Sequence, residues 1–102
     1  MAFTDEYDFE HLKNEAEKLV ISELERQLES FTEEVCRCND CVLDMTAIAL
    51  NSVKPIYMVS LLGSLYAATA MDEQAYATTI REAVFKAIEK VRKNPSHESH
   101  KA

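Results

Sequence analysis

Three cysteines within six residues are the part of this sequence best suited to chemistry. They stand at positions 36, 38 and 41 in the run Cys-Arg-Cys-Asn-Asp-Cys. A tight turn that leads into a helix N-terminus lets three sulfur atoms with this spacing converge on one ion, and the helix dipole favours the thiolate of Cys41. Arg, Asn and Asp between the cysteines do not belong in a core, which weighs against three inert thiols. The spacing predicts a zinc site formed by Cys36, Cys38 and Cys41, ahead of inert thiols and of a redox-active cysteine pair.

A structural zinc ion takes four ligands, and the chain has no fourth cysteine. His97 and His100 follow the last predicted helix in a polar tail, whereas His11 stands near the start of a long predicted helix whose far end meets the cysteines. We therefore expect His97 to close the site, with His100 as the next choice. No carboxylate and histidine pair with catalytic spacing accompanies the cysteines, so we expect a binding protein and not an enzyme.

The length, composition and charge limit the class of protein to which this chain can belong. The chain has 102 residues, of which 47% are hydrophobic and 28% charged, with one Gly and two Pro. This is typical of one helix-rich domain over 1–102, with a folded core at 7–93 and a polar tail at 94–102. The net charge of −7 argues against nucleic-acid partners. We expect no membrane span and no signal peptide, because no apolar run approaches the ~20 residues a span needs, and hence a cytoplasmic protein.

The elements that must position the cysteines are mostly helical. Apolar residues at steps of three and four predict a first helix over 8–34, about 40 Å long and longer than one small core can cover, which favours a homodimer. A nearly wholly apolar helix over 42–51, capped by Asp40, should be buried on all sides. A last helix should begin after Asp72 and end at Asn94-Pro95.

Residues 56–70 permit two interpretations. Two short apolar runs flank Gly63, the only glycine, and favour a β-hairpin, while Pro55 could instead open a helix. With the hairpin, the predicted fold is mainly α: a small helical domain with a short β-hairpin, stapled by zinc and forming a helical homodimer.

The central segment resembles a known family. The cysteine run at 36–41 is followed by Ala-Ile-Ala-Leu-Asn at 47–51 and Pro-Ile-Tyr at 55–57. In this order the residues resemble the late-competence-development protein ComFB family, over about residues 14 to 92. The resemblance implies a cytoplasmic homodimer of mostly helical subunits, each binding one zinc ion through the clustered cysteines and a further cysteine after the last helix. Here His97 and His100 occupy that stretch.

The resemblance also implies a role in signalling through cyclic di-GMP. Such a ligand needs cationic side chains for its phosphates and an aromatic or Arg face for its guanines. The candidates are those beside the family-like segment and in the basic C-terminal part: Lys54, Tyr57, Tyr66 and Arg81. Ile56 stands where the family often has a basic residue, and Lys54 could compensate.

The alternative function is a ligand-free dimeric adaptor. Its zinc would be purely structural, and the acidic face of the first helix would recruit an unidentified basic protein partner. That face consists of Glu23, Glu25, Glu29, Glu33 and Glu34.

Overall fold

The computed structural model describes residues 2–59 and 73–95 of the chain. Three α-helices account for most of these residues: α1 (Ala16–Ser30), α2 (Asn39–Leu50) and α4 (Glu73–Lys93). Two single 3-10 turns, Phe3–Asp5 and Phe9–His11, precede strand β1 (Lys13–Asn14), which pairs antiparallel with strand β2 (Tyr57–Met58). The predicted mainly helical class with a short antiparallel strand pair is therefore confirmed. Among the described helices, none is both long and apolar enough to cross a membrane.

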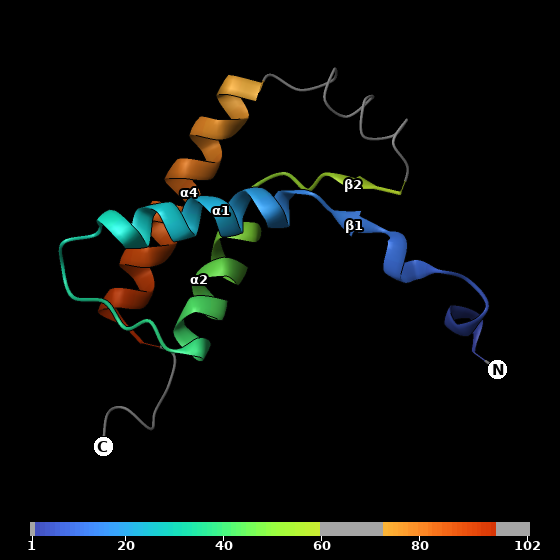
Figure 1. Ribbon diagram of the computed structural model, residues 1–102, viewed down its shortest axis with the longest axis horizontal. Helices are drawn as coiled ribbons and strands as arrows, with labels where there is room; N and C mark the ends of the chain where they lie inside the picture. The colour runs from blue at the N-terminus through green and yellow to red at the C-terminus, as the bar shows by residue number, and fades with distance from the viewer. Residues whose placement is uncertain (1, 60–72, 96–102) are drawn as a thin grey trace.

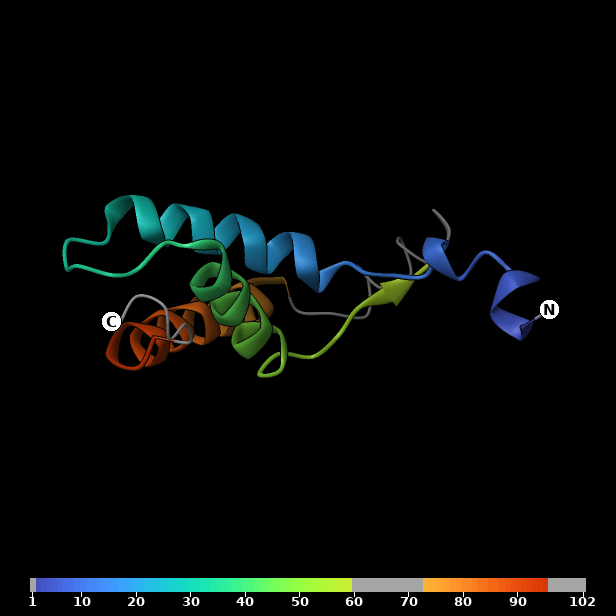
Figure 2. The ribbon, with the colours of Figure 1, turned by 90° about the horizontal axis from the view of Figure 1, so that it is seen from below.

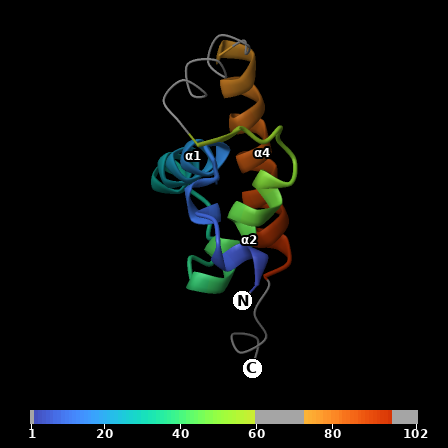
Figure 3. The same ribbon diagram turned by 90° about the vertical axis from the view of Figure 1, so that its right-hand side faces the viewer.

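The core lies where α4 packs on both other helices. In Figures 1 and 3, α1 crosses α4 while α2 lies alongside it. The buried stripe of α4 follows the predicted spacing and consists of Ile80, Ala83, Val84, Ala87, Ile88 and Val91. Val20 of α1 and Met45 of α2 are fully buried in the same cluster. The helix ends at Lys93, as predicted, because Pro95 disfavours a helical conformation for Asn94.

The first helix is shorter than the sequence predicts. The predicted range of 8–34 is wrong at both ends, since α1 spans 15 residues and about 22 Å. At its start, the side-chain Oδ1 of Asn14 accepts the amide hydrogen of Ala16 at 3.1 Å, while the Asn14 backbone is held extended in β1. At its end, Phe31 turns to an extended conformation, yet Phe31 and Val35 still pack against the core. The apolar spacing therefore does not require an unbroken helix, and the prediction of a dimer from the length of this helix no longer holds.

Helix α2 also differs from its predicted form. It begins at Asn39, before the predicted range of 42–51, and Cys38 instead of Asp40 is its N-cap. It is not buried on all sides of this chain, because the Leu43 side chain is 59% exposed. The buried residues form one stripe at a spacing of four: Cys41, Met45 and Ala49. Val42 and Ile48 are partly buried against the same core, whereas Leu43 and Ala47 are exposed, so a helix of apolar composition presents part of its surface to solvent.

The strand at Tyr57–Met58 lies in the segment where the sequence favours a strand over a helix. Its partner among the described residues is β1, with Lys13 opposite Met58 and Asn14 opposite Tyr57. The predicted turn at Gly63 and the strand around Tyr66 lie outside the described residues. The pairing joins the segment before α1 to the segment after α2, so a long-range contact fixes the path by which the chain enters α1.

Candidate functional site

The three cysteines lie together at the start of α2. Their sulfur atoms are all within 4.8 Å of one another, and none of the three forms a disulfide. Cys41 is fully buried, whereas Cys36 and Cys38 are half-buried at the edge of the core. The loop from Phe31 to Cys38 therefore brings two thiols to a third thiol that the first turn of α2 holds in place.

Cys38 has a second role as the N-cap of α2. Its backbone is extended, with φ −72° and ψ 166°, and its Sγ accepts the amide hydrogen of Cys41 at 3.4 Å. This hydrogen bond, with smaller contributions from the other two cysteines and the Asp40 amide, holds the pKa of the Cys38 thiol below its ordinary value. A thiolate at this position is able to bind a metal ion and to cap the helix with the same sulfur atom.

The donor set fits a zinc ion. Zinc–sulfur bonds of about 2.3 Å place the sulfur atoms of a tetrahedral site about 3.8 Å apart. Because the three sulfur atoms already lie within 4.8 Å, small side-chain rotations are enough to bring them onto one ion. Three soft thiolates favour zinc over hard cations such as Mg²⁺ or Ca²⁺.

The histidines were predicted to supply the fourth ligand. His97 and His100 lie outside the described residues. The end of α4 that precedes them contacts the loop from Phe31 to Cys38 through an ion pair. Arg92 Nη2 lies 2.6 Å from the Glu89 carboxylate on its own helix and 3.8 Å from the Glu33 carboxylate on the loop. His11 is exposed, and its Nδ1 lies 4.0 Å from Oδ2 of Asp8. Within the described residues, His11 belongs to no group of side chains that could together hold a metal ion.

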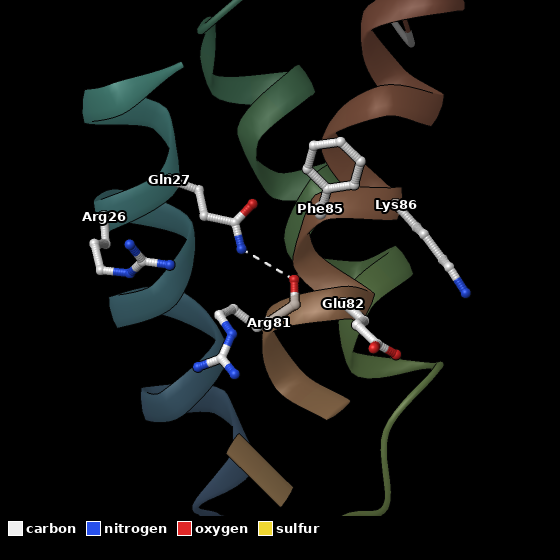
Figure 4. Close-up of a pocket in the computed structure, with 6 residues that line it drawn as sticks. All are labelled: Arg26, Gln27, Arg81, Glu82, Phe85 and Lys86. Atoms are coloured by element: carbon white, nitrogen blue, oxygen red, sulfur yellow. Dashed lines mark hydrogen bonds between the residues drawn. The ribbon is translucent and has the colours of Figure 1, made fainter. Parts of the chain in front are cut away.

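A second feature is a groove of about 350 Å³ between α1 and α4. Figure 4 shows the residues that line it: Arg26, Gln27, Arg81, Glu82, Phe85 and Lys86. The Gln27 side-chain amide donates a hydrogen bond to the Arg81 carbonyl at 3.0 Å and so joins the two helices. The ring of Phe85 is 50% exposed. The groove thus combines an accessible aromatic ring with three cations and one carboxylate.

The predicted ligand residues do not form one site in the described structure. Arg81 lines the groove, whereas Lys54 and Tyr57 do not. Tyr57 is 61% exposed in β2, the Lys54 carbonyl accepts a hydrogen bond from the Tyr76 hydroxyl at 2.6 Å, and Tyr66 lies outside the described residues. The basic C-terminal segment is the sequence signal that pointed to Arg81.

Sequence reasoning missed the groove residues around Arg81. Phe85 and Lys86 follow Arg81 on the exposed side of α4 and could have been found from its helical spacing. Arg26 and Gln27 could not, because they belong to α1 and reach the groove only through the packing of α1 on α4.

Comparison with known proteins decides the family. The family model for late competence development protein ComFB matches residues 13–95. The chain belongs to the ComFB family. A search of curated proteins finds no match. The solved structure of the late competence protein ComFB from Bacillus subtilis shares the fold, with a TM-score of 0.63 and 23% sequence identity over 83% of this chain and 94% of that one.

The ComFB match contains most, but not all, of the features described above. The three cysteines, both strands and every groove residue fall inside residues 13–95. The segment before Lys13 and the histidines at 97 and 100 fall outside it. The chain is therefore a ComFB-family competence protein with a cysteine cluster able to hold a metal ion, and its N-terminal segment is additional to the family match.

Proposed function

We propose that this chain is a zinc-stapled, dimeric ComFB-type regulatory protein that binds a cyclic dinucleotide, cyclic di-GMP, in the groove between α1 and α4. The observation that carries the proposal is the composition of the groove, which is lined by Arg26, Arg81 and Lys86 together with the half-exposed ring of Phe85. A ligand with phosphates and purine bases needs these two kinds of contact.

The charge of the groove stands out against the rest of the molecule. The whole chain carries −7, so an anion approaches it favourably only where cations gather. Arg26 is already hydrogen-bonded to the Glu23 carboxylate, which leaves Arg81 and Lys86 as the groove cations for a phosphate. A groove of about 350 Å³ lies at the small end of ligand pockets, which run from about 300 to 1,000 Å³. It suits one base and one phosphate, half of a cyclic dinucleotide.

The zinc ion is assigned a structural role, with Cys36, Cys38, Cys41 and His97 as its ligands. The first three converge at the N-cap of α2, and the Arg92–Glu33 ion pair holds the end of α4 beside the loop that carries them. His97 follows Lys93 by four residues, so the tail starts close to the cysteines. A closed site of this kind leaves no position for substrate, so we propose no enzymatic activity, and thiolate ligands suit a reducing, cytoplasmic compartment.

A second copy of the chain is proposed because one copy leaves much apolar surface open. The Cα radius of gyration is 16.2 Å, larger than the about 13 Å expected for a compact domain of this length. Large apolar residues on α2, on β2 and directly after β2 remain exposed: Leu43 by 59%, Tyr57 by 61% and Val59 by 67%. Soluble monomers rarely expose such surface, whereas the interface of an obligate dimer buries it.

Isothermal titration calorimetry of the zinc-loaded protein with a panel of cyclic dinucleotides tests the ligand. Removing one charge-assisted hydrogen bond costs about 1.5–3 kcal/mol, so Arg81→Ala should weaken cyclic di-GMP binding about 10- to 150-fold. Lys18→Ala is the matched control, because this exposed lysine on α1 lies outside the groove. Equal affinities of the two variants would remove the groove as the binding site.

The adaptor function is the alternative if no cyclic dinucleotide binds. Its support is the acidic surface of α1 and the following loop, where Glu25, Glu29 and Glu34 are exposed. Glu23 and Glu33 contribute less, because Arg26 and Arg92 already pair with them. Absence of heat with every cyclic dinucleotide, together with salt-sensitive retention of a basic protein partner that Glu25→Lys abolishes, would favour the adaptor.

A further inference from the structure

The segment before the strand pair, residues 2–12, forms an N-terminal arm that extends away from the helices (Figures 1 and 2). The arm contains four carboxylates and no Lys or Arg. It also carries three aromatic rings in mutual contact, with centroid distances of 4.8 Å for Phe3–Tyr7, 5.9 Å for Phe3–Phe9 and 6.3 Å for Tyr7–Phe9. These distances are typical of favourable aromatic pairs.

The ring cluster remains open to solvent. Phe3 is 65% exposed, Tyr7 57% and Phe9 47%, and none of the three belongs to the core cluster. Three large rings that shield only one another keep most of their apolar area in water, which is unfavourable by roughly 25 cal/mol per Å². The arm also precedes the residues that match the ComFB family model, so it lies outside that match.

The path of the arm is fixed where it joins the body. Asn14 Oδ1 accepts the Ile56 amide hydrogen at 2.8 Å, and the Glu15 amide donates to the Ile56 carbonyl at 2.7 Å. With the β1–β2 pairing, these bonds hold the base of the arm, and residues 2–12 extend away from the helices of their own chain (Figure 2). In this orientation the rings of the arm stand apart from the core of their own chain (Figure 1), so the surface considered for them is that of a second copy.

The α1–α4 groove has the complementary chemistry. Its half-exposed Phe85 ring offers an aromatic contact, and Arg81 and Lys86 are cations among its lining residues (Figure 4). The arm offers aromatic rings flanked by the carboxylates of Glu6 and Asp8. The aromatic rings of the arm are therefore suited to the Phe85 ring of the groove, and the carboxylates of the arm are opposite in charge to the groove cations. The arm of one copy is complementary to the groove of another in both respects.

We propose that the N-terminal arm of one copy docks in the α1–α4 groove of a second copy. One arm ring packs against Phe85, and arm carboxylates pair with Arg81 and Lys86. The inference rests on the second copy and the groove of the proposed function, and it adds a regulation to that site. Because the arm and an anionic ligand use the same cations, the arm is a built-in competitor of the ligand.

A tryptophan reporter in the groove tests the contact without any nucleotide. The chain has no Trp, so Phe85→Trp in the full-length protein gives a single indole. In a second version of the reporter protein, Phe3→Ser, Tyr7→Ser and Phe9→Ser remove the arm rings. We expect this arm variant to shift the indole emission to the red and increase its quenching by acrylamide. Leu19→Ser, which changes an exposed apolar residue of α1 outside the groove, is the matched control and should change neither.

The charge contribution has its own control. Glu6→Gln with Asp8→Asn should produce part of the red shift and remove its dependence on salt. Glu17→Gln with Glu25→Gln neutralises two exposed carboxylates of α1 and should leave the emission unchanged. Identical emission from intact-arm and arm-variant reporters would overturn the proposal.

Mixed dimers decide which groove the arm enters. One chain carries Phe85→Trp and the arm variant, and its co-purified partner carries an intact arm and Arg81→Glu. Docking between copies predicts that the indole regains the blue-shifted emission in the mixed dimer. Emission that stays red-shifted in the mixture, although it is blue-shifted in the intact-arm reporter, would place the arm on its own chain and overturn the assignment.

Calorimetry separates this inference from the proposed function. If both are correct, the arm variant binds cyclic di-GMP severalfold more tightly than the unmodified chain. If neither protein binds any cyclic dinucleotide, the proposed ligand fails, and the emission of the reporter alone decides whether the arm occupies the groove. Weaker cyclic di-GMP binding by the arm variant would contradict competition.

Discussion

Asn14→Ala should destabilise the protein by about 2–3 kcal/mol, because one side-chain oxygen supports two elements at once. Asn14 Oδ1 accepts the Ala16 amide hydrogen at the start of α1, and loss of such a hydrogen bond costs about 1 kcal/mol. It also accepts the Ile56 amide ahead of β2, and leaving this partly buried donor unpaired costs about 1–2 kcal/mol. Ala16 is fully buried and Ile56 is 9% exposed, so water replaces neither bond easily.

Thermal and urea unfolding of zinc-loaded protein at fixed concentration measure this change. For a domain near 100 residues, 2–3 kcal/mol corresponds to a fall in Tm of about 10–20 °C. Asn14→Asp retains an oxygen at the same position and is the matched control, with an expected loss below about 1 kcal/mol. An Asn14→Ala protein within about 0.5 kcal/mol of the unmodified chain would refute the reasoning, since the two amides would then need no side-chain partner.

The remaining predictions concern the metal and pH. Cys38→Ser should lower both zinc content by elemental analysis and Tm, because it removes a ligand and weakens the α2 cap; an emptied site with unchanged Tm would contradict a structural metal. His97→Ala should speed zinc loss to a chelator more than His100→Ala does, and equal rates would exclude His97 as the specific fourth ligand. The hydrogen bond from Arg26 lowers the pKa of the Glu23 carboxyl group from 4.5. The Arg26–Glu23 pair therefore contributes stability above pH 4.5, and this stability is lost as the pH falls through the lower pKa that Glu23 has in the folded protein. Glu23→Gln should flatten this acid-side loss in urea unfolding, and an unchanged slope would contradict it.

Helix α4 and the cysteine cluster were predictable because their signals are local. An apolar spacing of three and four over 21 residues, ended by Asn94-Pro95, determines one amphipathic helix with one buried face. Cysteines separated by one and two residues have sulfur atoms that backbone geometry alone keeps close, and they lie within 4.8 Å. The family resemblance uses the same contiguous segment and is confirmed over residues 13–95.

The limits of the first helix were not predictable from its apolar spacing. Phe31 and Val35 continue the stripe and pack against the core, but from extended chain after the helix has ended. Phe9 and Leu12 begin the stripe and stay 47% and 48% exposed on the arm. A periodic pattern records which side chains are apolar, and it does not distinguish a buried helix from a loop or an exposed arm at the same positions.

Contacts between residues distant in sequence decided the rest. The sequence by itself determined the helical class, the clustered thiols and the acidic charge of the N-terminal arm, because each depends on residue types within a few positions. Only the tertiary structure decided that Asn14 meets Ile56 and that Gln27 of α1 meets Arg81 of α4 beside a groove. The physical reason is that α1 and α4 are separated by more than forty residues, and the position of one on the other is set by side-chain packing in the shared core, which no local pattern encodes.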